Sequence, residues 1–194
     1  CEKVIEQNNL YSFINCGLSE AEIANKFIES KLPDDIEENL KVLTQYIKCP
    51  LAVRSSSILE DSRILPFAGI YKTYIAPNSN ANKDVCFKQL TDAVKLVYAS
   101  VFYEAPLRYA QNADIRIEEE KMAVLIQELV GEHYGDHFYP AISGVAQSYN
   151  FYPYYPMKPE DGIVSLTLGF GRTIVDGGRV FRFSPAYPKL NPLV

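Results

Sequence analysis

The most informative part of this chain reads Leu51-Ala-Val-Arg-Ser-Ser-Ser57, then Glu60-Asp61, then Phe67-Ala-Gly-Ile-Tyr-Lys-Thr-Tyr-Ile75. Its apolar start predicts a short buried strand that ends at Arg54 and three serines. The Arg54 guanidinium is a permanently charged planar fork that matches phosphate oxygens, and serine hydroxyls add short donors. Glu60 or Asp61 could instead pair with Arg54, so these residues leave a phosphate site and a structural ion pair equally open.

The segment from Gly69 to Ile75 predicts a second strand, with Tyr71, Thr73 and Ile75 on one face. A glycine at its start lets backbone N–H groups come close to a ligand. A basic residue at a strand end, beside a loop of small residues, is one way in which a protein holds a polyphosphate. The two segments together therefore favour an anion-binding loop.

Composition limits the class of protein. The 194 residues are 47% hydrophobic and 22% charged, which is typical of a globular core. The net charge of -5 gives no basic field for nucleic acid or an anionic membrane, and no apolar run could span a bilayer.

Four scattered cysteines predict reduced thiols and a cytoplasmic protein without a zinc site. Because the chain starts at Cys1 rather than methionine, we expect a fragment of a longer protein.

Residues 1–50 are predicted to form a helical scaffold without chemistry, ahead of a nucleotide-binding region at 51–194. Ser19 and Glu22 form a capping-box pattern, and the helix that they start must end near Pro33. Asp34 with Glu37 repeats this signal for a second helix. The scaffold therefore ends where the strand at Leu51 begins.

Beyond Ile75 the pattern predicts a long amphipathic helix over 85–101 and strands at 122–130, 139–151 and 163–168. Two histidines lie at 132–137, but their spacing is not that of a zinc-binding H-E-x-x-H motif, and Gly135 predicts a turn between two strands there. Residues 176–178 predict a hairpin turn. The tyrosine- and proline-rich loop at 151–159 is more typical of an interface or lid than of a catalytic site.

Gln127 is the one uncharged polar side chain in the strand at 122–130. An amide buried in an apolar strand needs partners, because leaving it unpaired costs about 1–3 kcal/mol. Adenine offers a donor and an acceptor on one edge and would suit it. The alternative is a glutamine bonded to neighbouring backbone.

Ordered blocks of this sequence resemble the ATP-binding region of the pyruvate phosphate dikinase and phosphoenolpyruvate synthase family. The pattern there is V-R-S-S, E-D and F-A-G followed by a threonine, which matches residues 53–73 here. Further blocks follow in the same order, namely Met122–Val130, Ser143–Ala146, Gly169–Gly171, Val175 and Gly177. The blocks extend over most of the chain, and their order makes the resemblance specific.

The resemblance implies an α+β, ATP-grasp-like fold with antiparallel or mixed sheets and packed helices. It implies binding of ATP and phosphorylation of a histidine or a small acceptor by the complete protein. Arg54 would be catalytic and would stabilise phosphate charge. The backbone at Ala68, Gly69, Ile70 and Tyr71, together with Thr73, would cradle the phosphates. The strand end at Gln127, Glu128, Leu129 and Val130 would bind the adenine.

The chain also departs from this family. The family's G-L-G-E block reads Gly169-Phe-Gly-Arg172 here, so an arginine replaces the acid. No segment matches the family's Gly-Gly-Lys or its later Mg²⁺-binding strand, so metal ligands and the phosphohistidine and pyruvate-binding domains are expected outside this fragment. We therefore expect the fragment alone to bind ATP weakly and to transfer nothing. The alternative function is a nucleotide-sensing or interaction module that kept the fold and lost catalysis.

Overall fold

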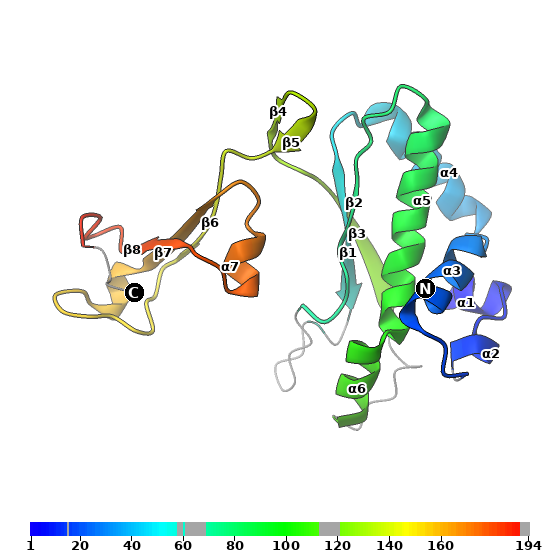
Figure 1. Cartoon of the computed structure of the whole chain (residues 1–194), viewed down its shortest axis with the longest axis horizontal. Coiled ribbons are helices and arrows are strands. Elements are labelled where there is room, and N and C mark those ends of the chain that lie inside the picture. The colour runs from blue at the N-terminus through cyan, green and yellow to red at the C-terminus, as the bar shows by residue number, and fades with distance from the viewer. Residues whose placement is uncertain (15, 58–59, 61–68, 113–120, 191–194) are drawn as a thin grey trace. The chain divides into compact units, whose positions relative to one another are not determined.

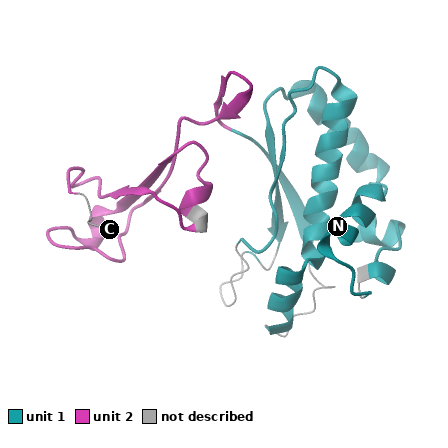
Figure 2. Ribbon diagram, in the orientation of Figure 1, with its two compact units in different colours: residues 1–129 teal, residues 130–194 magenta. Residues whose placement is uncertain are grey.

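The computed structural model describes residues 1–14, 16–57, 60, 69–112 and 121–190. The chain divides into two compact units, residues 1–129 and residues 130–194 (Figure 2). Antiparallel sheets with packed helices make up the fold, which confirms the expected mixture of helices and antiparallel strands. Among the described residues, no helix is both long and apolar enough to cross a lipid bilayer.

The first unit contains most of the helices and one three-stranded sheet. Its elements in chain order are α1 (Glu2–Gln7), α2 (Tyr11–Ile14), α3 (Glu20–Glu29), α4 (Asp34–Tyr46), β1 (Leu51–Ser57), β2 (Tyr74–Ala76), α5 (Lys83–Ala99), the 3₁₀ helix η1 (Ser100–Phe102), α6 (Glu104–Asn112) and β3 (Met122–Glu128). The strand order is β2-β1-β3, and both pairs are antiparallel. The long helix α5 agrees with the amphipathic pattern predicted for 85–101.

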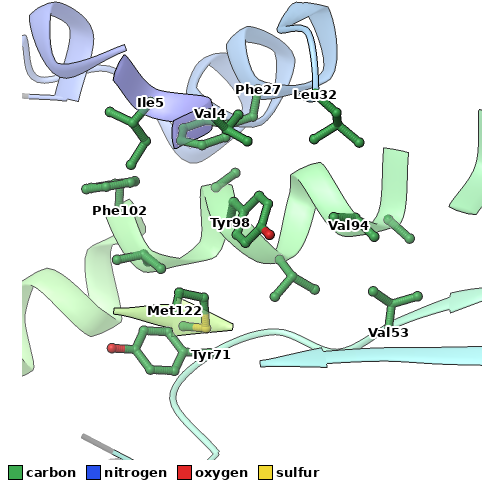
Figure 3. Close-up of a cluster of buried hydrophobic side chains, with 14 of the residues drawn as sticks. Val4, Ile5, Phe27, Leu32, Val53, Tyr71, Val94, Tyr98, Phe102 and Met122 are labelled. Atoms are coloured by element: carbon green, nitrogen blue, oxygen red, sulfur yellow. The ribbon is translucent and has the colours of Figure 1, made fainter. Parts of the chain in front are cut away.

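Helix α5 is the central layer of this unit, because the sheet packs against one side of it and α3 and α4 pack against the other (Figure 1). The core joins all three layers. Figure 3 shows Phe27 of α3 above α5, Tyr98 on α5, and Val53 of β1 below it. The helical segment 1–50 therefore contributes to the same core as β1 and β3, and the boundary between the two compact units along the chain falls at 129/130.

The two faces of the sheet differ in whether helices cover them. Side chains alternate along a strand, and β1 turns Leu51 and Val53 toward α5, where they are 1% and 0% exposed. The alternate residues lie on the opposite side, which we call the open face because, among the described residues of this unit, no helix covers it. The open face consists of Ala52, Arg54, Ser56, Ile75, Ala123, Leu125 and Gln127.

The predicted ends of the first two strands were wrong. Strand β1 does not end at Arg54 but continues through Ser57, because Arg54–Ser57 pair in register with Met122–Leu125 of β3. Strand β2 covers only 74–76 rather than 69–75. The reason is that Tyr71 is 5% exposed and packs in the core, while the Lys72 N–H donates to Ser100 Oγ and not to a strand neighbour.

The two predicted helix caps had different outcomes. The capping box of α3 is confirmed, since Glu22 N–H donates to Ser19 Oγ and the Ser19 N–H donates to Glu22 Oε2 at 2.8 Å. The cap predicted at Asp34 was wrong, because Pro33 is the N-cap and Asp34 already lies in the first turn of α4. Its carboxylate still favours the helix there through the helix dipole.

The second unit is built mainly from strands. Its elements are β4 (Glu132–Tyr134), β5 (His137–Tyr139), β6 (Ile142–Gln147), the 3₁₀ helix η3 (Pro159–Asp161), β7 (Ile163–Leu168), α7 (Arg172–Asp176) and β8 (Phe181–Phe183). Strands β4 and β5 form a hairpin through Gly135, as predicted, and β6-β7-β8 form an antiparallel sheet. The hairpin predicted at 176–178 was wrong, because Gly177, at φ 83°, ends helix α7 in the left-handed conformation.

Candidate nucleotide site

Arg54 lies on the open face of the first unit, with an exposed side chain. Its Nη1 donates to Oε1 of Gln127 on the neighbouring strand at 3.3 Å. Within the described part of the chain, no carboxylate forms a salt bridge with this guanidinium. Arg54 therefore keeps its positive charge and most of its donors available on an exposed sheet surface.

Glu60 does not pair with Arg54. Of the two acidic residues that the sequence offers as structural partners of Arg54, the structure therefore excludes one. Its Oε1 accepts from the Ser55 hydroxyl at 2.9 Å and its Oε2 accepts from the Ser57 N–H at 3.1 Å. The Glu60 N–H in turn donates to Ser57 Oγ at 3.2 Å. Glu60 thus bonds to the last residues of β1, while Asp61 lies outside the described residues.

The expected phosphate cradle is only partly described, because Ala68 lies outside the described residues. Gly69 is exposed at φ 78°, and a Cβ placed there would meet nothing within 4 Å. The Tyr71 side chain is buried in the core and the half-buried Ile70 side chain packs against it, so these residues offer mainly their backbone groups to a ligand. Thr73 is exposed. The segment therefore offers backbone groups and one hydroxyl.

The predicted adenine-binding strand end, Gln127–Val130, is more exposed than the sequence suggested. Gln127 is exposed rather than buried, so the argument that its amide must find partners inside a core was wrong. Leu129 donates its N–H to Pro50 O at 2.9 Å, and the side chain of Val130 is 85% exposed. Leu129 is the last residue of the first unit and Val130 is the first of the second. This stretch is thus both a strand end and the connection between units.

Glu128 points to the other side of β3 from Gln127, since neighbouring strand residues alternate. Its Oε2 accepts from the Cys49 thiol at 3.4 Å. The pKa of the Cys49 thiol is raised above its ordinary value, mainly by burial and to a smaller extent by the hydrogen bond to the Glu128 carboxylate. Cys49 is therefore a poor nucleophile at neutral pH.

We expect Glu128→Gln to speed alkylation of Cys49 by iodoacetamide at pH 8. The neutral amide removes the coulombic cause that raises the thiol pKa and leaves a weaker acceptor for the thiol, so the thiolate fraction at a fixed pH increases. Peptide mass spectrometry measures the rate, and the exposed Cys16 is the internal control whose rate should stay constant. An unchanged Cys49 rate would mean that the thiol does not bond to Glu128 in solution.

In the second unit, the sequence blocks that resemble the family, Ser143–Ala146 and Gly169–Gly171, lie next to each other at one end of the sheet. Ile142 pairs with Leu168, and the Gly169 N–H donates to Ala141 O at 3.1 Å. The Ser143 hydroxyl donates to Gly169 O at 2.6 Å, and a Cβ on Gly171 would lie 3.3 Å from Ser143 Cβ. The serine and the two glycines therefore form a tightly packed junction between β6, β7 and α7.

Sequence reasoning missed a hollow on the second unit. It measures about 440 Å³ and is lined by Ile142, Leu166, Thr167, Leu168, Arg179 and Phe181. Helix α7 lies on the opposite face, where Thr173 Oγ1 and Thr167 Oγ1 are 3.1 Å apart. The alternation of Leu166 and Leu168 was the available signal, but the sequence alone does not show that, among the described residues of this unit, no helix covers this face. Apolar walls with one arginine suit a flat ring that carries an anionic group.

The described residues contain no group of three or more His, Cys, Asp or Glu side chains that could hold a metal ion. At the histidine-containing hairpin, the His133 ring instead packs edge-on against Phe138, with centroids 5.1 Å apart. The described residues of this hairpin therefore do not fit a Mg²⁺ site.

Comparisons with known proteins bear directly on this arrangement. The family model described as pyruvate phosphate dikinase, AMP/ATP-binding domain, matches residues 1–191. A protein of Bacillus subtilis (strain 168) called uncharacterized phosphotransferase YvkC is 28% identical over 160 residues, which are 81% of this chain. The chain spans 17% of the length of that curated relative. Because the family model covers nearly the whole sequence, this chain belongs to the pyruvate phosphate dikinase family, as its AMP/ATP-binding domain.

Proposed function

We propose that the chain is the ATP-binding region of a cytoplasmic, phosphoenolpyruvate synthase-like phosphotransferase with an ATP-grasp fold. The observation that carries the proposal is Arg54, whose exposed guanidinium has a neutral partner, Gln127, and no ion pair with a described carboxylate. An arginine with its charge available is suited to phosphate recognition, because its donors match phosphate oxygens. The family match and the phosphotransferase name of the relative support the same conclusion.

Each part of the site would have a separate role. Arg54 would stabilise the negative charge that develops on the transferred phosphoryl group. The backbone at Ala68–Tyr71 and the Thr73 hydroxyl would hold the phosphates, and the backbone at Glu128–Val130 would contact the base. Mg²⁺, bound by ligands elsewhere in the protein, would neutralise phosphate charge. The acceptor would be a histidine or a small molecule bound by other domains of the same protein.

A second candidate function, a nucleotide-sensing module without catalysis, is favoured by two features. Arg172, in place of the family's glutamate, starts α7 with an exposed side chain. The loop after β6 also exposes Phe151, Tyr152 and Tyr155 at 71%, 89% and 96%. Exposed aromatic side chains gathered in one loop are typical of interaction surfaces.

Titration of the protein with ATP, AMP and GTP in the presence of MgCl₂, followed by assays of ATP turnover and ATP:AMP exchange, tests the proposal. A phosphotransferase region should bind ATP more tightly than GTP and should support turnover or exchange when the protein is complete. Binding of ATP without any turnover in the complete protein would favour the sensing module. Absence of ATP binding would overturn both functions.

A further inference from the structure

The contact between Arg54 and Gln127 follows from the register of β1 and β3. Arg54 lies opposite Leu125, and Gln127 lies opposite Ala52, so Arg54 and Gln127 are diagonal neighbours on the open face. Diagonal neighbours on one face of an antiparallel pair are within reach of long side chains. Across this diagonal, Nη1 of Arg54 donates to Oε1 of Gln127 at 3.3 Å.

The chemical type of the partner matters as much as its position. A carboxylate at this place would form an ion pair and would compete with phosphate for the guanidinium. A carboxamide oxygen instead occupies one of the five N–H donors of arginine and leaves its charge intact. Gln127 can therefore fix the direction of Arg54 without reducing its attraction for an anion.

Two carboxylates in the described part of the chain, Glu60 and Glu128, bond to groups other than Arg54. Glu60 is occupied by the Ser55 hydroxyl and the Ser57 N–H. Glu128, although adjacent to Gln127, lies on the other side of β3 and accepts from Cys49. Among the strand residues of the open face, Arg54 is the only charged side chain in the described part of the sheet. The local arrangement thus preserves one oriented positive charge.

We propose that Gln127 is a positioning residue for Arg54: its amide oxygen aims the guanidinium at the phosphates of the nucleotide, and its side chain does not read the base. This proposal rests on the proposed function of the chain as an ATP-binding region. It assigns Gln127 to the phosphate end of the ligand, and it leaves recognition of the base to the backbone of the following residues.

Separate titrations with ATP and with adenosine distinguish the two ends of the ligand. We expect Gln127→Leu to weaken ATP about tenfold, the scale of one hydrogen bond to a charged group, and to leave adenosine affinity unchanged. Gln127→Glu should weaken ATP at least as much, because its carboxylate would neutralise Arg54. In the Arg54→Ala background, Gln127→Leu should have no further effect, since a positioning residue acts only through the group that it positions.

Two controls separate this role from a structural one. Gln147→Leu changes an exposed strand glutamine of the second unit and should leave ATP affinity unchanged. Thermal melting of Gln127→Leu should match that of the wild type, because the side chain is exposed. Nitrogen-15 NMR of the Arg54 guanidinium should show slower rotation in the wild type than in Gln127→Leu, with or without nucleotide.

The outcomes separate the inference from the proposed function. If Gln127→Leu weakens ATP and adenosine equally and adds fully to Arg54→Ala, Gln127 contacts the base and the inference is wrong. If the wild type binds ATP and the variant binds it equally well, the inference fails while the proposed function stands. If the wild type binds no ATP, the proposed function fails, and the positioning role fails with it.

Discussion

Phe27→Ala is expected to lower the free energy of unfolding of the first unit by roughly 3–5 kcal/mol, the range measured for buried phenylalanines. Phe27 is 1% exposed, and its ring stacks on that of Phe102 with centroids 5.9 Å apart. Removing the ring leaves a cavity between α3 and the 3₁₀ helix η1 that follows α5. Urea denaturation followed by far-UV circular dichroism measures the loss.

The same variant tests whether residues 1–50 are a separate scaffold. Because Phe27, Tyr98 and Val53 belong to one core, hydrogen exchange should speed up in the amides of β1 and β3 as well as in α3. Tyr46→Ala on α4 is the matched control, since that aromatic ring is 79% exposed and its loss should change stability by less than about 0.5 kcal/mol. Unchanged exchange in β1 would support a domain boundary at residue 50 instead.

Local sequence signals predicted helices and strands well where residues close together in the chain determine the structure. The capping box at Ser19, the apolar stripe of α5 and the run at 163–168 all gave the elements that the structure contains. These signals depend on neighbours within a turn or two of chain. The strand at 122–130 was also predicted, with an end two residues beyond that of β3.

Errors arose where a distant partner decides the outcome. Ser55–Ser57 are strand residues because β3 pairs with them along their whole length, which overrides their weak strand propensity. Gly177 was read as part of a hairpin, but a left-handed glycine serves a helix end equally well. Choosing between the two requires knowing that α7 packs on β7.

The candidate site was predicted through family resemblance more than through chemistry. The residues alone left Arg54 open between a phosphate ligand and an ion pair, and the Ser55 and Ser57 contacts of Glu60 remove one of its two possible acidic partners. The environment of Gln127 was misjudged because alternation shows that β3 has two faces without showing which one a helix covers. For the same reason the hollow beside Phe181 was not foreseen.

Arg54→Ala should remove about 2–4 kcal/mol of transition-state stabilisation from ATP-dependent phosphoryl transfer, as for other preorganised charge donors. The value follows from the ratio of kcat/KM between wild type and variant. Arg54→Lys should recover only part of the activity, because an ammonium group cannot make the bidentate contact of a guanidinium. The Tm should hardly change in either variant, since Arg54 is exposed and its one hydrogen bond to a described residue is with neutral Gln127.

Arg108→Ala provides the matched control for the loss of an exposed arginine from the first unit. Arg108 lies on α6 and pairs with Glu104 one helical turn away, a kind of surface ion pair that contributes about 0.3–0.5 kcal/mol. Its removal should leave both kcat/KM and Tm close to the wild-type values. A phosphate-binding Arg54 therefore predicts a large loss of activity without a loss of stability. If Arg54→Ala instead lowers stability by several kcal/mol while the surviving protein keeps its activity, Arg54 is a structural residue of the sheet, and the phosphates bind elsewhere.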